Sequence, residues 1–269
     1  MPAPPSAPRR AAMPVDYVPF EEARAAKGLR MTVVPGIPSP WSEAAKGIFH
    51  VKRLPWQAVR LDARSDAMAD WAKERSAPVA FFDDEAPRGS WPQILLLAER
   101  LAPAPALLPS DPLERARAFG IAHEICGEGG LVWDRRLQGV QAGLRGEPGG
   151  FPEPVAQYLA GKYGYHAEAG ARYGPRVVAL LGMLAGLLHA QRRAGSRFYL
   201  GDRLTAVDVY SATAMAMFKP LPKELCPMMD LIRPTLEAMD EATAKALDPI
   251  LLEHRDFVYR EFLELPLTL

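Results

Sequence analysis

The chain has 269 residues, of which 49% are hydrophobic and 24% are charged, a composition typical of globular proteins. Its 32 basic and 32 acidic side chains cancel, which argues against a dedicated binder of nucleic acid or of anionic membranes. A length of this order indicates one large domain or two modest ones. Proline is about twice as frequent as usual, and we expect many of the 27 prolines to separate helices.

Residues 1–29 are expected to form an N-terminal extension that is partly disordered. Residues 1–12 are rich in proline and alanine, and Met13 is as good a candidate for the natural start as Met1. Arg9 and Arg10 are not followed by an apolar stretch, so the sequence does not predict a secretory signal here.

The sequence also indicates the compartment. Its longest apolar run, residues 177–190, is shorter than the ~18–20 residues that cross a membrane, so we expect no membrane span. Cys126 and Cys226 are far apart and form no closely spaced pair. This pattern argues against a disulfide framework and favours a cytoplasmic protein.

Short strands and helices alternate between residues 30 and 105. We expect strands at 31–34, 57–61 and 78–82 and helices at 40–53, 63–75 and 91–101. A further short strand fits before the last of these helices. This order predicts an α/β domain with a small sheet. Prolines 103, 105 and 109 then predict a stiff connector.

Residues 110–265 show only helical periodicity and predict an all-helical domain. The expected helices span 112–144, 153–167, 173–194, 205–218, 229–245 and 249–263. Asp111, Pro112 and Glu114 form a strong helix start, with an N-cap, a proline at the first position and an acid at the third. The glycine-rich run 127–130 should kink or interrupt the first helix. Thr205 and Asp208 form a capping box, whose role is in folding.

Three element starts in the α/β half are candidates for a binding site. Ser39 precedes Pro40 at a helix start; it is either a simple N-cap or a hydroxyl that, with the free N–H groups of the helix, stabilises a thiolate. Pro78 precedes a strand, either as punctuation or as a cis proline that exposes the Ala77 backbone to an extended peptide. Ser90 either caps the next helix or holds a carboxylate at its N-terminus.

The chain resembles the glutathione transferase superfamily in four segments: SPWSEAAKGIFHVKRLPWQAVRLD, SAPVAFFDD, RGSWPQILLLAERLAP and RFYLGDRLTAVDVYSATAMAMF. The resemblance covers roughly residues 30–220. It implies a thioredoxin-like domain that binds glutathione, followed by a helical domain that holds the second substrate, in a homodimer. Ser39 would activate the thiol, Ala77 and the cis Pro78 would pair with the tripeptide backbone, and Ser90 would hold the γ-glutamyl carboxylate.

The chain departs from this family at one position. Gly89 stands before Ser90, where the family usually has an acid that contacts the γ-glutamyl amino group. Asp83, Asp84 and Glu85 are the nearby acids that could replace it. A second choice stays open, because Ser42 also lies near the helix start and competes with Ser39 as the residue that activates the thiol.

The second substrate is expected to contact Trp41, His123, Trp133 and Tyr210. Core packing would explain Trp133 and Tyr210 equally well, and a solvated helix face would explain His123. His123 and Cys126 are three residues apart, but two ligands do not make a metal site, so we expect no metal. The absence of GxSxG and CxxC motifs argues against a serine hydrolase of the nucleophile-elbow type and against a thiol-disulfide oxidoreductase.

The sequence therefore predicts a glutathione transferase-like enzyme. It would activate the thiol of glutathione for attack on an electrophilic small molecule or a peroxide, without nucleic-acid or membrane partners. The alternative is a binding or scaffold protein that keeps the fold without catalysis. Gly89 and the long N-terminal extension motivate this alternative.

Overall fold

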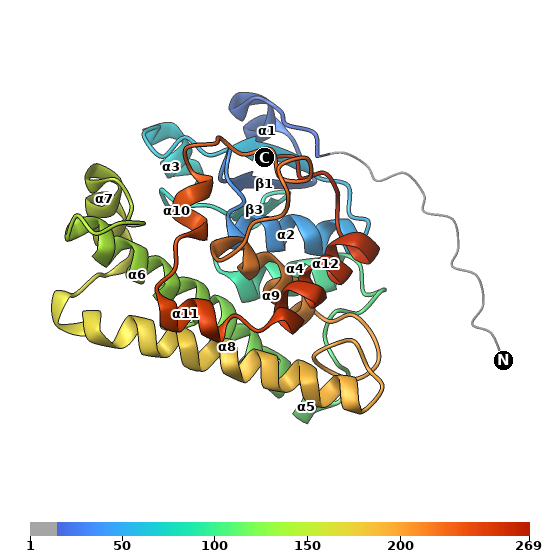
Figure 1. Ribbon diagram of the computed structural model, residues 1–269. Coiled ribbons are helices and arrows are strands. Elements are labelled where there is room, and N and C mark those ends of the chain that lie inside the picture. Colours follow the sequence, from blue (N-terminus) through green and yellow to red (C-terminus); the bar gives the residue numbers. More distant parts are fainter. Residues whose placement is uncertain (1–14) are drawn as a thin grey trace.

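The computed structural model describes residues 15–269. The expectations about the tail at residues 1–12 and about Met13 fall outside this part. The chain folds into a half with a mixed sheet and a larger helical half beside it, and its C-terminus returns to the sheet half (Figure 1).

The sheet has three strands in the order β2-β1-β3. The central strand β1 (Leu29–Val33) pairs in parallel with β2 (Gln57–Arg60) and antiparallel with β3 (Val79–Phe82). A single bridge between Ala80 and Arg88 stands where the sequence suggested a fourth strand. All five residues of β1 are buried, because helices cover both faces of the sheet.

The two faces of the sheet follow the alternation of side chains along β1. Leu29, Met31 and Val33 face α2 (Pro40–Val51) and α4 (Trp91–Leu101), which lie between the sheet and the helical half (Figure 1). On the other side, α1 (Phe20–Ala25) and α3 (Asp66–Ala72) contribute to smaller clusters around Val59 and Val79. The three main strands and the three helices predicted for this half are confirmed, with ends shifted by a few residues, whereas the further short strand is reduced to the bridge at Arg88.

The described part of the N-terminal extension packs on the sheet. Tyr17 forms a parallel bridge with Ala58 of β2, and the amides of Val18 and Ala58 donate to the carbonyls of Ala58 and Asp16. The extension therefore covers an edge of the sheet that would otherwise expose unpaired backbone groups.

The helical half begins at Pro112 and contains the helices α5 (Pro112–Cys126), α6 (Leu131–Leu144), α7 (Glu153–Tyr163), α8 (Gly170–Arg193), α9 (Ala206–Ala214), α10 (Arg233–Glu237), α11 (Glu241–Ala246) and α12 (Pro249–Phe262). Every residue of α9 is buried, and this helix packs against α2, α5 and α12. It is the central element that joins the two halves.

Local sequence signals explain where the helices end. The glycine-rich run 127–130 interrupts the expected helix 112–144 and divides it into α5 and α6, as predicted. The prediction of a single helix over residues 229–245 was wrong. Ala238 is extended and ends α10, and Asp240 caps the next helix, α11, by accepting from the Thr243 amide. Gly164, in the left-handed conformation, ends α7 before the predicted end.

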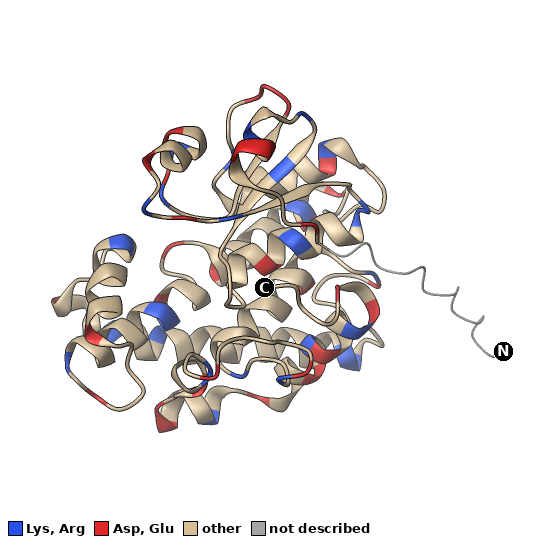
Figure 2. Cartoon of the chain, turned by 90° about the horizontal axis from the view of Figure 1, so that it is seen from above, with Lys and Arg blue, Asp and Glu red and all other residues tan. Residues whose placement is uncertain are grey.

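One helix of the described part, residues 167–193, is long and apolar enough to cross a membrane by length and composition. In the structure it packs on α6, α11 and α12 through a stripe of buried side chains: Tyr173, Val177, Leu180, Leu181, Leu184 and Leu188. This spacing is that of a helix on the surface of a globular domain, with one face packed on the core. Basic and acidic residues are interspersed along the chain in both halves, and neither sign gathers in one of them (Figure 2).

Lys52 fastens the end of α2 to the connector between the halves. Its side chain is fully buried, and Nζ donates to the carbonyls of Ala102 and Pro105 at 2.6 and 2.9 Å and pairs with Glu99 at 2.6 Å. Replacing Lys52 with methionine is expected to lower the free energy of unfolding by about 2–3 kcal/mol, because these acceptors lose a charged donor. Urea unfolding should show this loss, whereas Lys27→Met, which breaks an exposed ion pair with Asp84, should change stability by less than about 1 kcal/mol. Equal effects of the two substitutions would contradict the assignment.

Tyr17 should make stability fall at alkaline pH. Its hydroxyl donates to the Thr268 carbonyl, and burial, with a smaller effect of the Glu43 charge, raises its pKa from 10.0 to about 12. Between pH 10 and 12 the unfolded chain ionises this phenol and the folded chain does not, so stability present below pH 10 is lost across this window. Urea unfolding from pH 9 to 12 should therefore show a shallower decline in Tyr17→Phe than in the wild type. An unchanged decline would contradict this role.

Candidate functional site

A cavity of about 490 Å³ lies between the two halves. One wall comes from α2, the segment before β3 and the start of α4. The other comes from the α5–α6 junction, α7 and α9. The cavity brings together all predicted site residues except Ser39: Trp41, Ala77, Pro78, Gly89, Ser90, His123, Trp133 and Tyr210.

The segment before β3 presents free backbone groups to the cavity. The peptide bond between Ala77 and Pro78 is cis, as predicted. Across residues 15–269, the N–H and C=O of Ala77 have no hydrogen-bond partner. An extended peptide in the cavity can therefore pair with both groups, as a strand pairs with a sheet edge.

The start of α4 offers a site for a carboxylate. Ser90 is its exposed N-cap, and the Ser90 amide donates to Oε1 of Gln93 at 3.3 Å, which is one half of a capping box. This bond gives Ser90 a structural role through its backbone. Ser90 also lines the cavity beside the first amides of an eleven-residue helix, where negative charge is favoured.

The two candidate serines of α2 differ in their surroundings. Ser42 is completely buried, and its Oγ accepts from the Val34 amide at 3.2 Å, so this hydroxyl holds α2 to the end of β1. Ser39 is the N-cap of α2 and is 5% exposed, and its side chain caps no amide of the helix. Ser39 does not line the cavity; the wall begins two residues later, at Trp41.

Aromatic rings of the helical half pack against Trp41 of α2 and form an aromatic wall of the cavity. Tyr163 stacks on Trp41, with ring centroids 6.0 Å apart, and meets Trp133 edge-on at 4.9 Å. The Arg136 guanidinium lies 5.5 Å from the Trp41 ring and 5.2 Å from the Tyr163 ring. Trp41 also donates from Nε1 to the Cys126 carbonyl at 2.9 Å, which ties α2 to the end of α5. This wall suits an apolar or aromatic ligand.

Two groups on this wall are unsuited to nucleophilic chemistry. Burial raises the pKa of the Cys126 thiol and raises that of the Tyr210 phenol well above its usual value. The Tyr210 hydroxyl donates to the Trp91 carbonyl at 3.3 Å. Within residues 15–269, no group of three or more His, Cys, Asp or Glu side chains could hold a metal ion. A reactive thiol would have to come from a bound molecule.

None of the three acids suggested as a replacement at Gly89 lines the cavity. Oδ1 of Asp83 accepts from the Gly28 amide at 2.8 Å, Asp84 pairs with Lys27, and Glu85 pairs with Arg88 and Arg100. Sequence reasoning missed Glu74, Lys162 and Tyr163, which do line it. These residues belong to no local motif, and only the packing of α7 against the sheet half brings them together.

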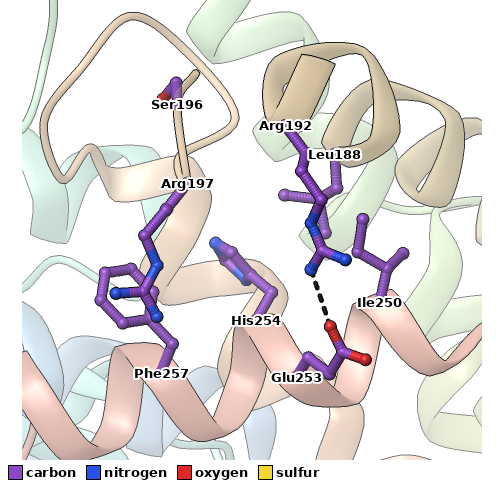
Figure 3. Close-up of a pocket in the computed structure, with 8 residues that line it drawn as sticks. All are labelled: Leu188, Arg192, Ser196, Arg197, Ile250, Glu253, His254 and Phe257. Atoms are coloured by element: carbon purple, nitrogen blue, oxygen red, sulfur yellow. Dashed lines mark hydrogen bonds and ion pairs between the residues drawn. The ribbon is translucent and has the colours of Figure 1, made fainter. Parts of the chain in front are cut away.

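A second, smaller cavity of about 120 Å³ lies between the end of α8, the turn after it, and α12 (Figure 3). Its charged groups already contact other side chains of the protein. Arg192 pairs with Glu253 at 2.7 Å, Arg197 lies 3.5 Å from the Phe257 ring, and Nε2 of His254 is held by Asp208 at 3.0 Å. None of the predicted site residues lines this cavity.

Comparison with known proteins identifies the fold. No protein-family model and no curated protein matches the sequence. Among solved structures, the chain is similar to a glutathione S-transferase of Methylobacterium radiotolerans in complex with glutathione sulfonate, with a TM-score of 0.55 and 19% identity over 87% of this chain and 92% of that one. It is also similar to a glutathione S-transferase of Methylobacillus flagellatus with glutathione bound, with a TM-score of 0.59 and 13% identity over 87% of this chain and 96% of that one.

A maleylpyruvate isomerase described as a bacterial glutathione S-transferase of the Zeta class gives a TM-score of 0.52 and 16% identity, over 84% of this chain and 95% of that one. The chain thus has the fold of glutathione S-transferase structures. The predicted order, a thioredoxin-like sheet half followed by an all-helical half, is confirmed.

Proposed function

We propose that the larger cavity binds glutathione and that the protein is a glutathione-dependent transferase. The observation that carries this proposal is the free N–H and C=O of Ala77 in the same cavity as the N-terminus of α4. Together they match an extended tripeptide with a carboxylate at one end. Two solved structures of this fold hold glutathione or its sulfonate, which supports the same ligand.

In this mechanism the backbone of Ala77 pairs with the cysteinyl residue of glutathione, and Ser90 with the first amides of α4 holds the γ-glutamyl carboxylate. The bound thiol lies toward the N-terminus of α2, whose unpaired amides favour a thiolate. Ser39 would donate its hydroxyl to that thiolate. The thiolate then forms a bond to an electrophilic carbon or to a peroxide oxygen, and the leaving group departs with the electron pair of the broken bond.

The second substrate is a small electrophile that packs on the aromatic wall. Trp41 and Trp133, with Tyr163 between them, offer edges and faces to a flat apolar molecule. His123 is exposed at the rim, where its ring lies over Gly127 and is accessible to a polar substituent.

Calorimetric titration with glutathione tests the proposal, followed by turnover assays with an aryl halide and an organic peroxide. We expect saturable binding at or below millimolar glutathione and glutathione-dependent turnover. No binding at millimolar glutathione would overturn the proposal.

One observation favours the non-catalytic alternative. Ser39 lies outside the cavity wall, so the thiol of a bound glutathione could lack a hydroxyl partner. Binding of glutathione without turnover on any electrophile in the panel would support a binding or scaffold protein.

For either function we propose a cytoplasmic homodimer with domains at residues 30–105 and 110–265. The free, buried Cys126 and Cys226 agree with a reducing compartment, and sedimentation equilibrium tests the dimer.

A further inference from the structure

The space beside Gly89 is filled by a carboxylate from another part of the chain. A Cβ atom added to Gly89 would lie 1.7 Å from Oε1 of Glu74 and 2.6 Å from its Cδ. The Glu74 carboxylate therefore occupies the point where a side chain of residue 89 would begin. Glutamate at position 74 and glycine at position 89 are complementary, because any larger residue at 89 would displace the carboxylate.

The fold places Glu74 there through the end of α3. The helix stops at Ala72, and Lys73 adopts the left-handed conformation with φ 61°, which turns the chain toward the cavity. Glu74 then lines the cavity together with Ser76, Ala77 and Pro78. The acid and the free backbone groups of Ala77 thus come from one continuous segment.

The Glu74 carboxylate is available to a ligand. It is solvent-accessible, and in the part of the chain that the structure describes it makes no hydrogen bond and no ion pair within 4 Å. Partial burial in the cavity raises its pKa, and the charge of Lys162 on the opposite wall opposes this effect. Asp83, Asp84 and Glu85, by contrast, are already bound to other groups.

We infer that Glu74 binds the free α-ammonium group of the γ-glutamyl end of glutathione; this inference rests on the proposed function. A free amino-acid head group carries an ammonium and a carboxylate on the same carbon. The site offers an unpaired carboxylate against Gly89 and, at the next residue, the Ser90 hydroxyl and the N-terminus of α4. The ammonium of the ligand thus faces the Glu74 carboxylate beside Gly89, and the carboxylate of the ligand faces the positive N-terminus of α4 at Ser90. Glu74 is a residue of substrate specificity, since it selects ligands with a free amino group.

The test compares glutathione with glutaryl-cysteinyl-glycine, which lacks only the α-amino group, by calorimetry on the full chain. The wild type should bind glutathione about 10- to 100-fold more tightly than the analogue, the range of one charged hydrogen bond. In Glu74→Gln the affinity for glutathione should fall by about this factor, and the affinity for the analogue should stay within about threefold. Asp84→Asn, which alters an exposed acid of the same half, should behave as the wild type. Glu74→Ala/Gly89→Asp should recover part of the preference for glutathione.

The outcomes separate this inference from the proposed function. A wild type that binds neither ligand at millimolar concentration overturns both. A wild type that binds glutathione while Glu74→Gln binds it equally well overturns the inference and leaves the proposed function standing. If Glu74→Gln lowers the affinity for both ligands equally and also lowers the Tm, Glu74 stabilises the cavity through Lys162 and does not bind the amino group. This result also overturns the inference.

Discussion

Replacing Asp208 with alanine is expected to lower the free energy of unfolding by about 3–5 kcal/mol, because four buried donors converge on its carboxylate. Oδ2 accepts from the amide and the hydroxyl of Thr205, both at 2.8 Å. Oδ1 accepts from the Tyr199 amide at 2.9 Å and lies 3.0 Å from Nε2 of His254. Asp208 is completely buried, so water cannot replace the lost acceptor. Thermal unfolding should shift down by roughly 10 °C or more at this chain length.

Two further variants test whether this loss of stability is specific to the buried carboxylate of Asp208. Asp208→Asn keeps one oxygen and turns the other into a donor, so half of the converging donors would face an NH2 group, and we expect nearly the same loss. Asp202→Ala removes an exposed acid from the same turn and should change stability by less than about 1 kcal/mol. If Asp208→Ala and Asp202→Ala unfold at the same urea concentration, the capping network does not carry the junction of α9 with α12.

Much of this architecture could be predicted from local patterns. The helix at 91–101 matches α4 to the residue, because Ser90 and Pro92 mark its start and the connector prolines mark its end. The capping box of Thr205 and Asp208 opens α9 as expected. Patterns of this kind act within a few residues, so they are visible in the sequence. The additional bonds of Asp208 to Tyr199 and His254 join segments up to 46 residues apart, and no local pattern reveals them.

The residues of the candidate site also fall into two groups, those marked by local motifs and those brought in by packing between distant segments. Motifs at helix and strand starts located Ala77, Pro78 and Ser90, because each start needs a recognisable residue. The wall from α7 was missed, since Lys162 and Tyr163 become neighbours of Trp41 only when the halves pack. Glu74 was missed for a related reason: sequence proximity pointed to Asp83–Glu85, whereas the turn at Lys73 brings a more distant acid to Gly89.

Replacing Ser39 with alanine is expected to reduce glutathione-dependent turnover by about 10- to 100-fold and to change the affinity for glutathione by less than about threefold. The proposed hydrogen bond from Ser39 forms with the thiolate, and one charged hydrogen bond corresponds to about 1.5–3 kcal/mol. The neutral thiol accepts such a bond weakly, so in the proposed complex binding depends instead on Ala77, Ser90 and Glu74. The pKa of the bound thiol, followed by thiolate absorbance, should rise by about 1–2 units in the variant.

Ser42→Ala is the matched control, because both serines lie at the start of α2 and both are buried. Loss of the Ser42 hydroxyl leaves the Val34 amide without its acceptor, so this variant should lose about 1–3 kcal/mol of stability but keep its turnover and the pKa of the bound thiol. Unchanged turnover in Ser39→Ala would assign thiolate stabilisation to the amides of α2, because neither substitution removes a backbone N–H. A loss of turnover in Ser42→Ala alone would assign it to Ser42. Together, the two substitutions identify which group at this helix start stabilises the thiolate. The positions of the two serines in the sequence leave both candidates open.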